Sequence, residues 1–250
     1  MKALNTSIRI LLLLFSITSS TCIIAANGGE EENTKTATKK SSSDRKRKIK
    51  RLQKFTPSIK KGDDLSSFSY HQKSYVIEMG VETVWNAYIN VKPNEAWKGP
   101  LNTFKQSYSK SRNLLFDSTS TELPCIELGM VYELNLKIVK LLNVGVAFQI
   151  TEINEAEKII EFTYGKDNKS HGRQRIVFKK EGNKTFIIHY SNFKSDSKFR
   201  DKHLYPKFHE KCMDEFHANL HELIKLKTKT QQEKEIIKDQ NTIINGLAFE

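Results

Sequence analysis

Histidines near the C-terminus are the residues of this sequence with the clearest potential for chemistry. Placed at 100° steps on a helix beginning after residue 205, His209 falls in the middle of the apolar half, between Phe216 and Leu220. An unpaired buried imidazole costs ~1–3 kcal/mol, so His209 needs a partner. One possibility is that Tyr132, Tyr190 or a water is this partner. The other is that His209 faces a polar group of a ligand or acts in acid–base chemistry. His209 is therefore the candidate catalytic residue.

His217 and His221 stand four residues apart in "HANLH", with Glu210 and Asp214 on the same helical stripe. This spacing is compatible with zinc ligands, which makes both histidines candidate metal ligands. The stripe falls on the polar half of the helix, however, and no glutamate stands inside the pair as in a zinc-protease motif. The pattern favours histidines that face solvent, and we expect no metal.

Two arginines alternate in "SHGRQRIVF", where Arg173 and Arg175 share one face of a predicted strand and Gln174 and Ile176 share the other. If the arginine face points outward, it is a solvated sheet surface. If it points inward, Arg175 is a candidate to hold a carboxylate or phosphate head group in a bidentate manner.

Other catalytic motifs do not occur. The sequence has no phosphate-binding glycine loop, no Ser-His-Asp signature and no G-x-S-x-G elbow, and we expect no cofactor. Two sequons, at Asn168 and Asn183, fall in predicted hairpin turns. They are candidate glycosylation sites if the chain passes through a eukaryotic secretory route.

The elements that position these residues begin with a short β-prone run that ends at Gly80. Apolar residues after it follow helical spacing at Val81, Val84, Trp85 and Tyr88, and a second short helical turn stops at Gly99-Pro100. From residue 101 the period is mostly two, with polar turns between the runs, which predicts an antiparallel meander with poorer edge strands in 101–116. The last element is a long amphipathic helix that would lie against the sheet.

This order of elements resembles the helix-grip fold of the START-like superfamily, also called SRPBCC, the polyketide-cyclase and lipid-transfer group. "VETVWNAYIN" resembles the group's first helix, and "FTYGKDNKSHGRQRIVF", "FIIHYSNFKSDSKF" and "LYPKFHEKCMDEF" are similar to an uncharacterised bacterial START-like family. The resemblance covers roughly residues 68–226. It implies an α+β fold in which a curved antiparallel sheet of six to seven strands wraps around a long C-terminal helix, with two short helices after the first strand.

A curved sheet and one covering helix seldom fill the space between them, so an apolar pocket is expected there. The inward faces of the strands and the helix supply its predicted lining: Tyr132, Leu134, Phe148, Phe162, Tyr164, Phe178, Ile188, Tyr190, His209, Cys212 and Phe216. The alternative is that these side chains pack together as core. The resemblance implies a binding module for a lipid, sterol or aromatic small molecule. The alternatives are a cyclase- or isomerase-like enzyme that uses the same cavity, or an interaction protein that works through its basic N-terminal tail.

The net charge of +12 belongs to that tail. Residues 35–61 hold twelve Lys or Arg and one acid, whereas the chain from Gly62 onward holds 27 basic and 25 acidic residues. The segment is either a solvated linker, a contact for an anionic surface or glycan, or a dibasic processing site. We expect no specific nucleic-acid partner.

The expected domain organisation has four parts. Residues 1–26 read as a signal peptide, which predicts a secreted or periplasmic protein without a transmembrane span. Residues 27–66 are a predicted disordered basic linker, 67–226 the START-like domain, and 227–250 a polar tail or an extension of the last helix. We expect a monomer. Cys125 and Cys212 either form a disulfide in an oxidising compartment or remain a loop thiol and a buried helix thiol.

Overall fold

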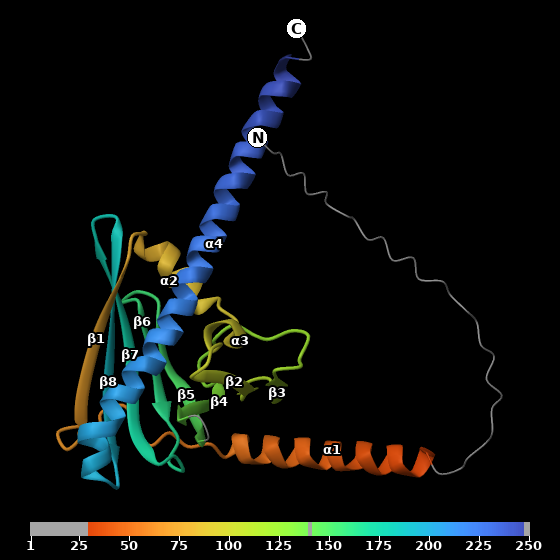
Figure 1. Ribbon diagram of the computed structural model, residues 1–250, viewed down its shortest axis with the longest axis vertical. Helices are drawn as coiled ribbons and strands as arrows, with labels where there is room; N and C mark the ends of the chain where they lie inside the picture. The colour runs from red at the N-terminus through yellow and green to blue at the C-terminus, as the bar shows by residue number, and fades with distance from the viewer. Residues whose placement is uncertain (1–29, 140–141, 248–250) are drawn as a thin grey trace, which may run out of the picture. The chain divides into compact units, whose positions relative to one another are not determined.

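The computed structural model describes residues 30–139 and 142–247 (Figure 1). The predicted signal peptide, residues 1–26, lies outside the described residues. The chain divides between Asp44 and Arg45 into two units, of which Arg45–Glu250 holds the folded domain. The described part of the first unit is the beginning of helix α1 (Glu30–Gln53), which continues into the second unit.

The domain is built on one antiparallel sheet of eight strands in the order β1-β8-β7-β6-β5-β4-β2-β3 (Figure 1). From β4 onward each strand pairs with the next, which is the predicted meander. The strands are β1 (Ser69–Ile77), β2 (Asn102–Ser109), β3 (Leu114–Asp117), β4 (Val131–Val139), β5 (Leu142–Asn154), β6 (Ile159–Tyr164), β7 (Ser170–Glu181) and β8 (Lys184–Ser195). The count exceeds the six to seven strands that the sequence predicted.

Helices cover one face of this sheet. Two short helices, α2 (Val81–Ile89) and α3 (Pro93–Ala96), follow β1 as predicted. After the last strand, a π-helical turn, η1 (Arg200–Leu204), leads into the long helix α4 (Tyr205–Leu247), which crosses the sheet. The helix continues past residue 226, so most of the polar C-terminal segment is helical. A curved antiparallel sheet that holds a long C-terminal helix is the helix-grip arrangement, and the predicted α+β fold is confirmed.

The main core lies on the face of the sheet that α2, α3 and α4 cover, here called the inner face. Trp85 and Tyr88 from α2, Met130 before β4, Ile187 from β8 and Leu220 from α4 are at most 2 % exposed. They belong to one apolar cluster that joins all the layers. Burying each such side chain contributes about 1.5–3 kcal/mol, so this cluster fixes the helices on the sheet.

The opposite, outer face is also partly covered, and this corrects a prediction. Residues 45–61 form no disordered linker: the last turns of α1 place Leu52 in a buried cluster with Tyr108, Leu115 and Val131. Beyond the helix, the backbone N–H of Ser58 donates to the carbonyl of Tyr164 at 2.7 Å. Ile49 and Leu52 stand three residues apart in α1, so the helix places both on one side, and Phe55 packs against the same cluster just after the helix ends.

Candidate functional site

An apolar cavity of about 40 Å³ lies on the inner face, where α2, α3 and α4 meet strands β4 to β7. Six aromatic side chains dominate its wall. The lining residues are Tyr88, Val91, Pro93, Ala96, Trp97, Ile126, Tyr132, Phe148, Ile150, Ile160, Phe162, Ile176 and Phe216. This free volume is small for a ligand pocket, so side chains fill most of the space here.

One residue of the cavity wall has a polar atom without a partner in the described part of the chain. The hydroxyl of Tyr132 is buried and makes no hydrogen bond to any part of the chain that the structure describes. Its ring stacks on Phe148 with a centroid distance of 5.4 Å, which fixes its orientation. Burial raises the pKa of Tyr132 well above its ordinary value, so the hydroxyl stays protonated and can donate a hydrogen bond.

A second tyrosine of the wall, Tyr88, begins a chain of buried hydrogen bonds that leads away from the cavity. Its hydroxyl lies 2.7 Å from His217 Nδ1 on α4, and His217 Nε2 lies 3.0 Å from His189 Nδ1 on β8. His189 Nε2 is 2.8 Å from the side-chain oxygen of Gln174 on β7. The amide nitrogen of Gln174 then donates to the hydroxyl of Tyr164 at 2.8 Å. All of these groups are at least nine-tenths buried.

The histidines of this region are held neutral. Burial, followed by the neighbouring imidazoles, places the pKa of His189 and His217 well below the ordinary value. Burial likewise raises the pKa of Tyr88 well above its ordinary value. The hydrogen-bond chain therefore joins five elements, α2, α4, β8, β7 and β6, by neutral hydrogen bonds, which in a buried site avoid the desolvation cost of a charge.

His209, the candidate catalytic residue, is buried but does not line the cavity. Its ring stacks on Tyr205 at 5.1 Å and meets the edges of His189 and His71 at 5.9 and 6.1 Å. Neither ring nitrogen has a partner within the described residues. Tyr132 and Tyr190, the two predicted partners from the chain, do not bond to it. Burial, then His189 and His71, keeps the pKa of His209 well below its ordinary value. The geometry does not favour an acid–base role for His209 on a ligand in this cavity.

The structure divides the predicted cavity residues into three groups. Tyr132, Phe148, Phe162 and Phe216 line the cavity. Four more are buried in the surrounding core without reaching the wall: Leu134, Tyr164, Phe178 and Cys212.

Ile188 and Tyr190 lie on the outer face of β8. Their predicted position in the cavity was wrong, because the inward-facing residues of this strand are their neighbours, one position away in the sequence. Burial along β8 alternates with Ile187 and His189 inside, and the pairing of β7 with β8 sets Tyr190 beside Arg175. The run "FIIHY" is apolar on both faces, and its periodicity cannot tell which face is inner.

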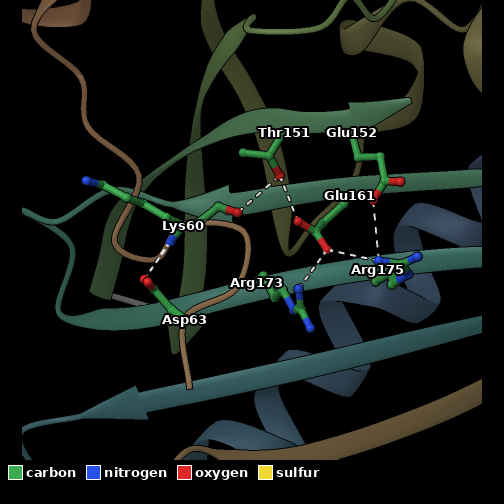
Figure 2. Close-up of polar contacts among 8 residues, drawn as sticks. Lys60, Asp63, Thr151, Glu152, Glu161, Arg173 and Arg175 are labelled. Atoms are coloured by element: carbon green, nitrogen blue, oxygen red, sulfur yellow. Dashed lines mark hydrogen bonds and ion pairs between the residues drawn. The ribbon is translucent and has the colours of Figure 1, made fainter. Parts of the chain in front are cut away.

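Arg175 consequently does not reach the cavity. It lies on the outer face with Arg173, where both guanidinium groups contact Glu161 at 3.2–3.4 Å and Arg175 also contacts Glu152 at 3.3 Å (Figure 2). Thr151 donates a further hydrogen bond to Glu161 at 3.1 Å. The alternative in which Arg175 points inward and binds a head group is wrong, because its side chain lies on the outer face and is paired there with Glu152 and Glu161.

The His217–His221 stripe also differs from expectation. His217 is fully buried, because β1, β8 and α2 surround α4 on more than its apolar half, and the ring of Tyr75 lies 4.0 Å from it. His221 is only partly buried. Within residues 30–139 and 142–247, no group of three His, Cys, Asp or Glu residues is placed to hold a metal ion.

The sequons and cysteines have distinct surroundings. The side-chain amide of Asn168 donates to the carbonyl of Ala147 at 2.6 Å, whereas Asn183 is exposed in the β7–β8 hairpin. Cys125 and Cys212 are both free, the first in a loop and the second buried in α4. None of the described helices is long and apolar enough to cross a membrane.

Sequence reasoning missed the wall that α2, α3 and their surroundings supply: Tyr88, Val91, Pro93, Ala96, Trp97 and Ile126. The helical spacing of Val84, Trp85 and Tyr88 did indicate a buried face. What it could not indicate is which part of the core that face bounds. His189 and Gln174 were missed because their contacts are not local: they are 15 residues apart in the sequence, and His189 is 28 residues from His217.

Comparison with known proteins gives likeness of fold only. No family model matches the sequence, and no curated protein matches it. Among solved structures, KanY protein is 12% identical with a TM-score of 0.46, covering 63% of this chain and 98% of that one. The Zhui aromatase/cyclase from Streptomyces sp. R1128 is 7% identical with a TM-score of 0.47, covering 63% and 94%. Norcoclaurine synthase from Thalictrum flavum, in complex with dopamine and hydroxybenzaldehyde, is 9% identical with a TM-score of 0.48, covering 66% and 94%.

The fold itself rests on the observed topology, with eight antiparallel strands, two short helices after β1 and the long helix α4 on the inner face. Residues 69–226 of this chain therefore form a helix-grip domain, the fold of the START-like superfamily.

Proposed function

We propose that the domain binds a small aromatic molecule with one hydroxyl group, of the phenol class, in the cavity on the inner face. The buried and unpartnered hydroxyl of Tyr132 is the observation that carries the proposal. An unmade hydrogen bond in an apolar site costs about 1–3 kcal/mol. A ligand hydroxyl at this position would recover about 0.5–1.5 kcal/mol of it, net of the loss of its own hydration.

The character of the wall supports an aromatic ligand. Rings from Trp97, Phe148, Phe162 and Phe216 surround the space and offer both faces and edges. Aromatic pairs in offset or edge-to-face geometry contribute about 0.5–1.5 kcal/mol beyond the burial of their area.

The volume of the cavity argues against a lipid or sterol as ligand. Pockets for drug-sized molecules enclose about 300–1,000 Å³, several times the free volume of about 40 Å³ found here. A single ring requires the smallest widening of the cavity. Ile126, in the loop between β3 and β4, can move aside without breaking hydrogen bonds within the sheet.

The test compares phenol with toluene, which has nearly the same shape but no hydroxyl. Ligand-observed NMR titration of the full chain gives both dissociation constants. We expect saturable binding of both probes and a preference for phenol. We expect Tyr132→Phe to remove about 2- to 10-fold of that preference while toluene affinity stays within twofold, because only the hydrogen bond is lost.

Tyr108→Phe is the matched control, since the hydroxyl of Tyr108 donates to Asn113 and its ring belongs to the outer-face cluster. This control should leave both affinities unchanged. Absence of saturable binding by either probe would contradict the proposed function. A phenol preference that survives in Tyr132→Phe would contradict the assigned anchor.

A further inference from the structure

The placement of the Gln174 amide gives the hydrogen-bond chain that starts at the cavity wall a direction. The side-chain oxygen of Gln174 can only accept, and its nitrogen is committed to Tyr164 and Ser191 at 2.8 Å each. His189 must therefore carry its proton on Nε2 and donate to Gln174.

This direction fixes the rest of the chain. With its proton on Nε2, neutral His189 has a lone pair on Nδ1, which accepts from Nε2–H of His217. His217 then has a lone pair on Nδ1, which accepts from the hydroxyl of Tyr88. Every donor and acceptor between Tyr88 and Gln174 is thus used once, and all groups are neutral.

An added proton has no place in this chain. On His189 Nδ1, it would set two N–H groups against each other across 3.0 Å. On His217 Nδ1, it would turn the Tyr88 hydroxyl, 2.7 Å away, from donor to acceptor, and the buried hydroxyl hydrogen would lose the one acceptor that the described residues give it. Either site would also hold a buried positive charge, which is strongly unfavourable without a counter-charge.

The surroundings supply no such counter-charge. His217 is faced by Tyr88 from α2, His189 from β8, Tyr75 and Lys73 from β1, and His209 and His221 from its own helix. Around His189 stand Gln174, Phe162, His71, His209 and His217.

The carboxylates nearest to this region are already engaged. Asp214 accepts from Tyr75 at 2.9 Å and contacts Lys73 at 2.8 Å, and Glu210 contacts Lys73 at 2.6 Å and His71 at 3.6 Å. In the described parts of the chain, neither His189 nor His217 has a hydrogen bond or ion pair to a carboxylate.

The hydrogen-bond chain is coupled directly to the cavity. Tyr88 is part of the wall, and Phe216, another wall residue, is adjacent to His217 in α4. Breaking the bonds between Tyr88, His217 and His189 removes polar links that join α2, α4 and β8 around this end of the cavity. Water that enters on separation of these elements would hydrate a charged imidazole.

We infer that protonation of the His189–His217 pair opens the cavity, so that a ligand held at neutral pH is released in mild acid. The inference rests on the proposed function for its ligand, but the opening itself is a property of the chain. Affinity should be constant near neutral pH, where the closed form predominates. In acid, once the open form becomes the major one, affinity should fall by about tenfold per pH unit for each proton taken up on opening.

The experiment follows two readouts in the full chain between pH 7.5 and 5. The first is the dissociation constant of phenol, which remains un-ionised throughout this range. The second, which needs no ligand, is acrylamide quenching of the fluorescence of the two tryptophans, Trp85 in the core and Trp97 in the cavity wall. Far-UV circular dichroism at each pH identifies the range in which the fold is intact.

The diagnostic variant is His189→Gln with His217→Gln, because glutamine can accept one hydrogen bond and donate another but does not titrate. We expect its phenol affinity and its quenching to be flat over the range in which wild type changes at least tenfold. The control, His203→Gln, alters an exposed histidine in η1 and should keep the wild-type profile.

If the double variant does not fold, nitrogen-15 NMR of the wild-type imidazoles decides. At pH 7.5 both rings must carry the proton on Nε2, and the onset of protonation must coincide with the rise in quenching. A different tautomer, or protonation without any rise in quenching, would overturn the inference. So would wild-type quenching that stays flat while the fold is intact. Absence of phenol binding at pH 7.5, with quenching that still rises in acid, would refute the proposed function alone.

Discussion

The two faces of the sheet accommodate their polar side chains in different ways. On the inner face, polar groups are neutral and linked in the chain from Tyr88 through His217 and His189 to Gln174. On the outer face they are charged and paired, as in the cluster of Glu161 with Arg173 and Arg175 (Figure 2).

The difference follows from access to water. The two outer-face arginines remain partly exposed, with side-chain exposures of 29 % for Arg173 and 32 % for Arg175, so their charges keep part of their hydration. Glu161 is only 11 % exposed, and its charge is compensated by both arginines. The inner-face groups have almost no hydration, because α4 and the short helices exclude water from them. Stability of the inner face should therefore respond to pH, and that of the outer face to salt and to the loss of its covering segment.

The largest expected effect is acid destabilisation through the inner face. The pKa of His189, His209 and His217 lies well below the unfolded value, so the unfolded chain binds more protons as the pH falls. Stability is full above about pH 6.5 and decreases below it, by about 1.4 kcal/mol per pH unit for each histidine. Urea unfolding followed by circular dichroism at pH 7.5, 6.5 and 5.5 measures the slope. A free energy of unfolding that is equal at all three would show that these histidines are not held neutral.

The next effect compares one buried leucine on each face. Leu220 of α4 and Leu52 of α1 are both at most 1 % exposed. We expect Leu220→Ala to cost about 3–4 kcal/mol, because the main core joins all layers, and Leu52→Ala at most about 2 kcal/mol, because its covering segment can detach locally. Urea unfolding and hydrogen exchange of β2 to β4 test this. Equal losses would mean that the outer cover unfolds together with the main core.

The smallest effect concerns the ion pair that fastens α1 to the outer face. Arg51 lies 2.5 Å from Glu133, but its side chain is 57 % exposed, so Arg51→Gln should cost only about 0.5–1 kcal/mol. High salt should lower the stability of wild type toward that of the variant. Lys50→Gln, an exposed neighbour on the same helix, is the control and should change nothing. A loss in Arg51→Gln that is independent of salt would indicate packing of the arginine stem instead.

The sequence predicted the order of elements well because their signals are local. The helical spacing of Val84, Trp85 and Tyr88 and the alternation of Tyr132 with its neighbours depend only on residues within a few positions. It failed where a segment is apolar on both faces, as around Ile188, or where few apolar residues are spread among charges, as around Leu52.

The candidate site was predictable only in part. Phe148, Phe162 and Phe216 line the cavity, on the side to which their strand and helix periods point. His217 was placed in solvent because a helical wheel assumes that one half of a helix is exposed, whereas the sheet and α2 enclose α4 more fully.

By itself, the sequence determined the helix-grip order of elements, the amphipathic last helix and the concentration of positive charge near the N-terminus. Only the tertiary structure decided that the Tyr132 hydroxyl has no partner among the described residues and that Tyr88, His217, His189 and Gln174 form one hydrogen-bond chain. Periodicity assigns a face to each residue, but hydrogen bonds depend on distances between elements far apart in the chain, which packing of the whole core sets.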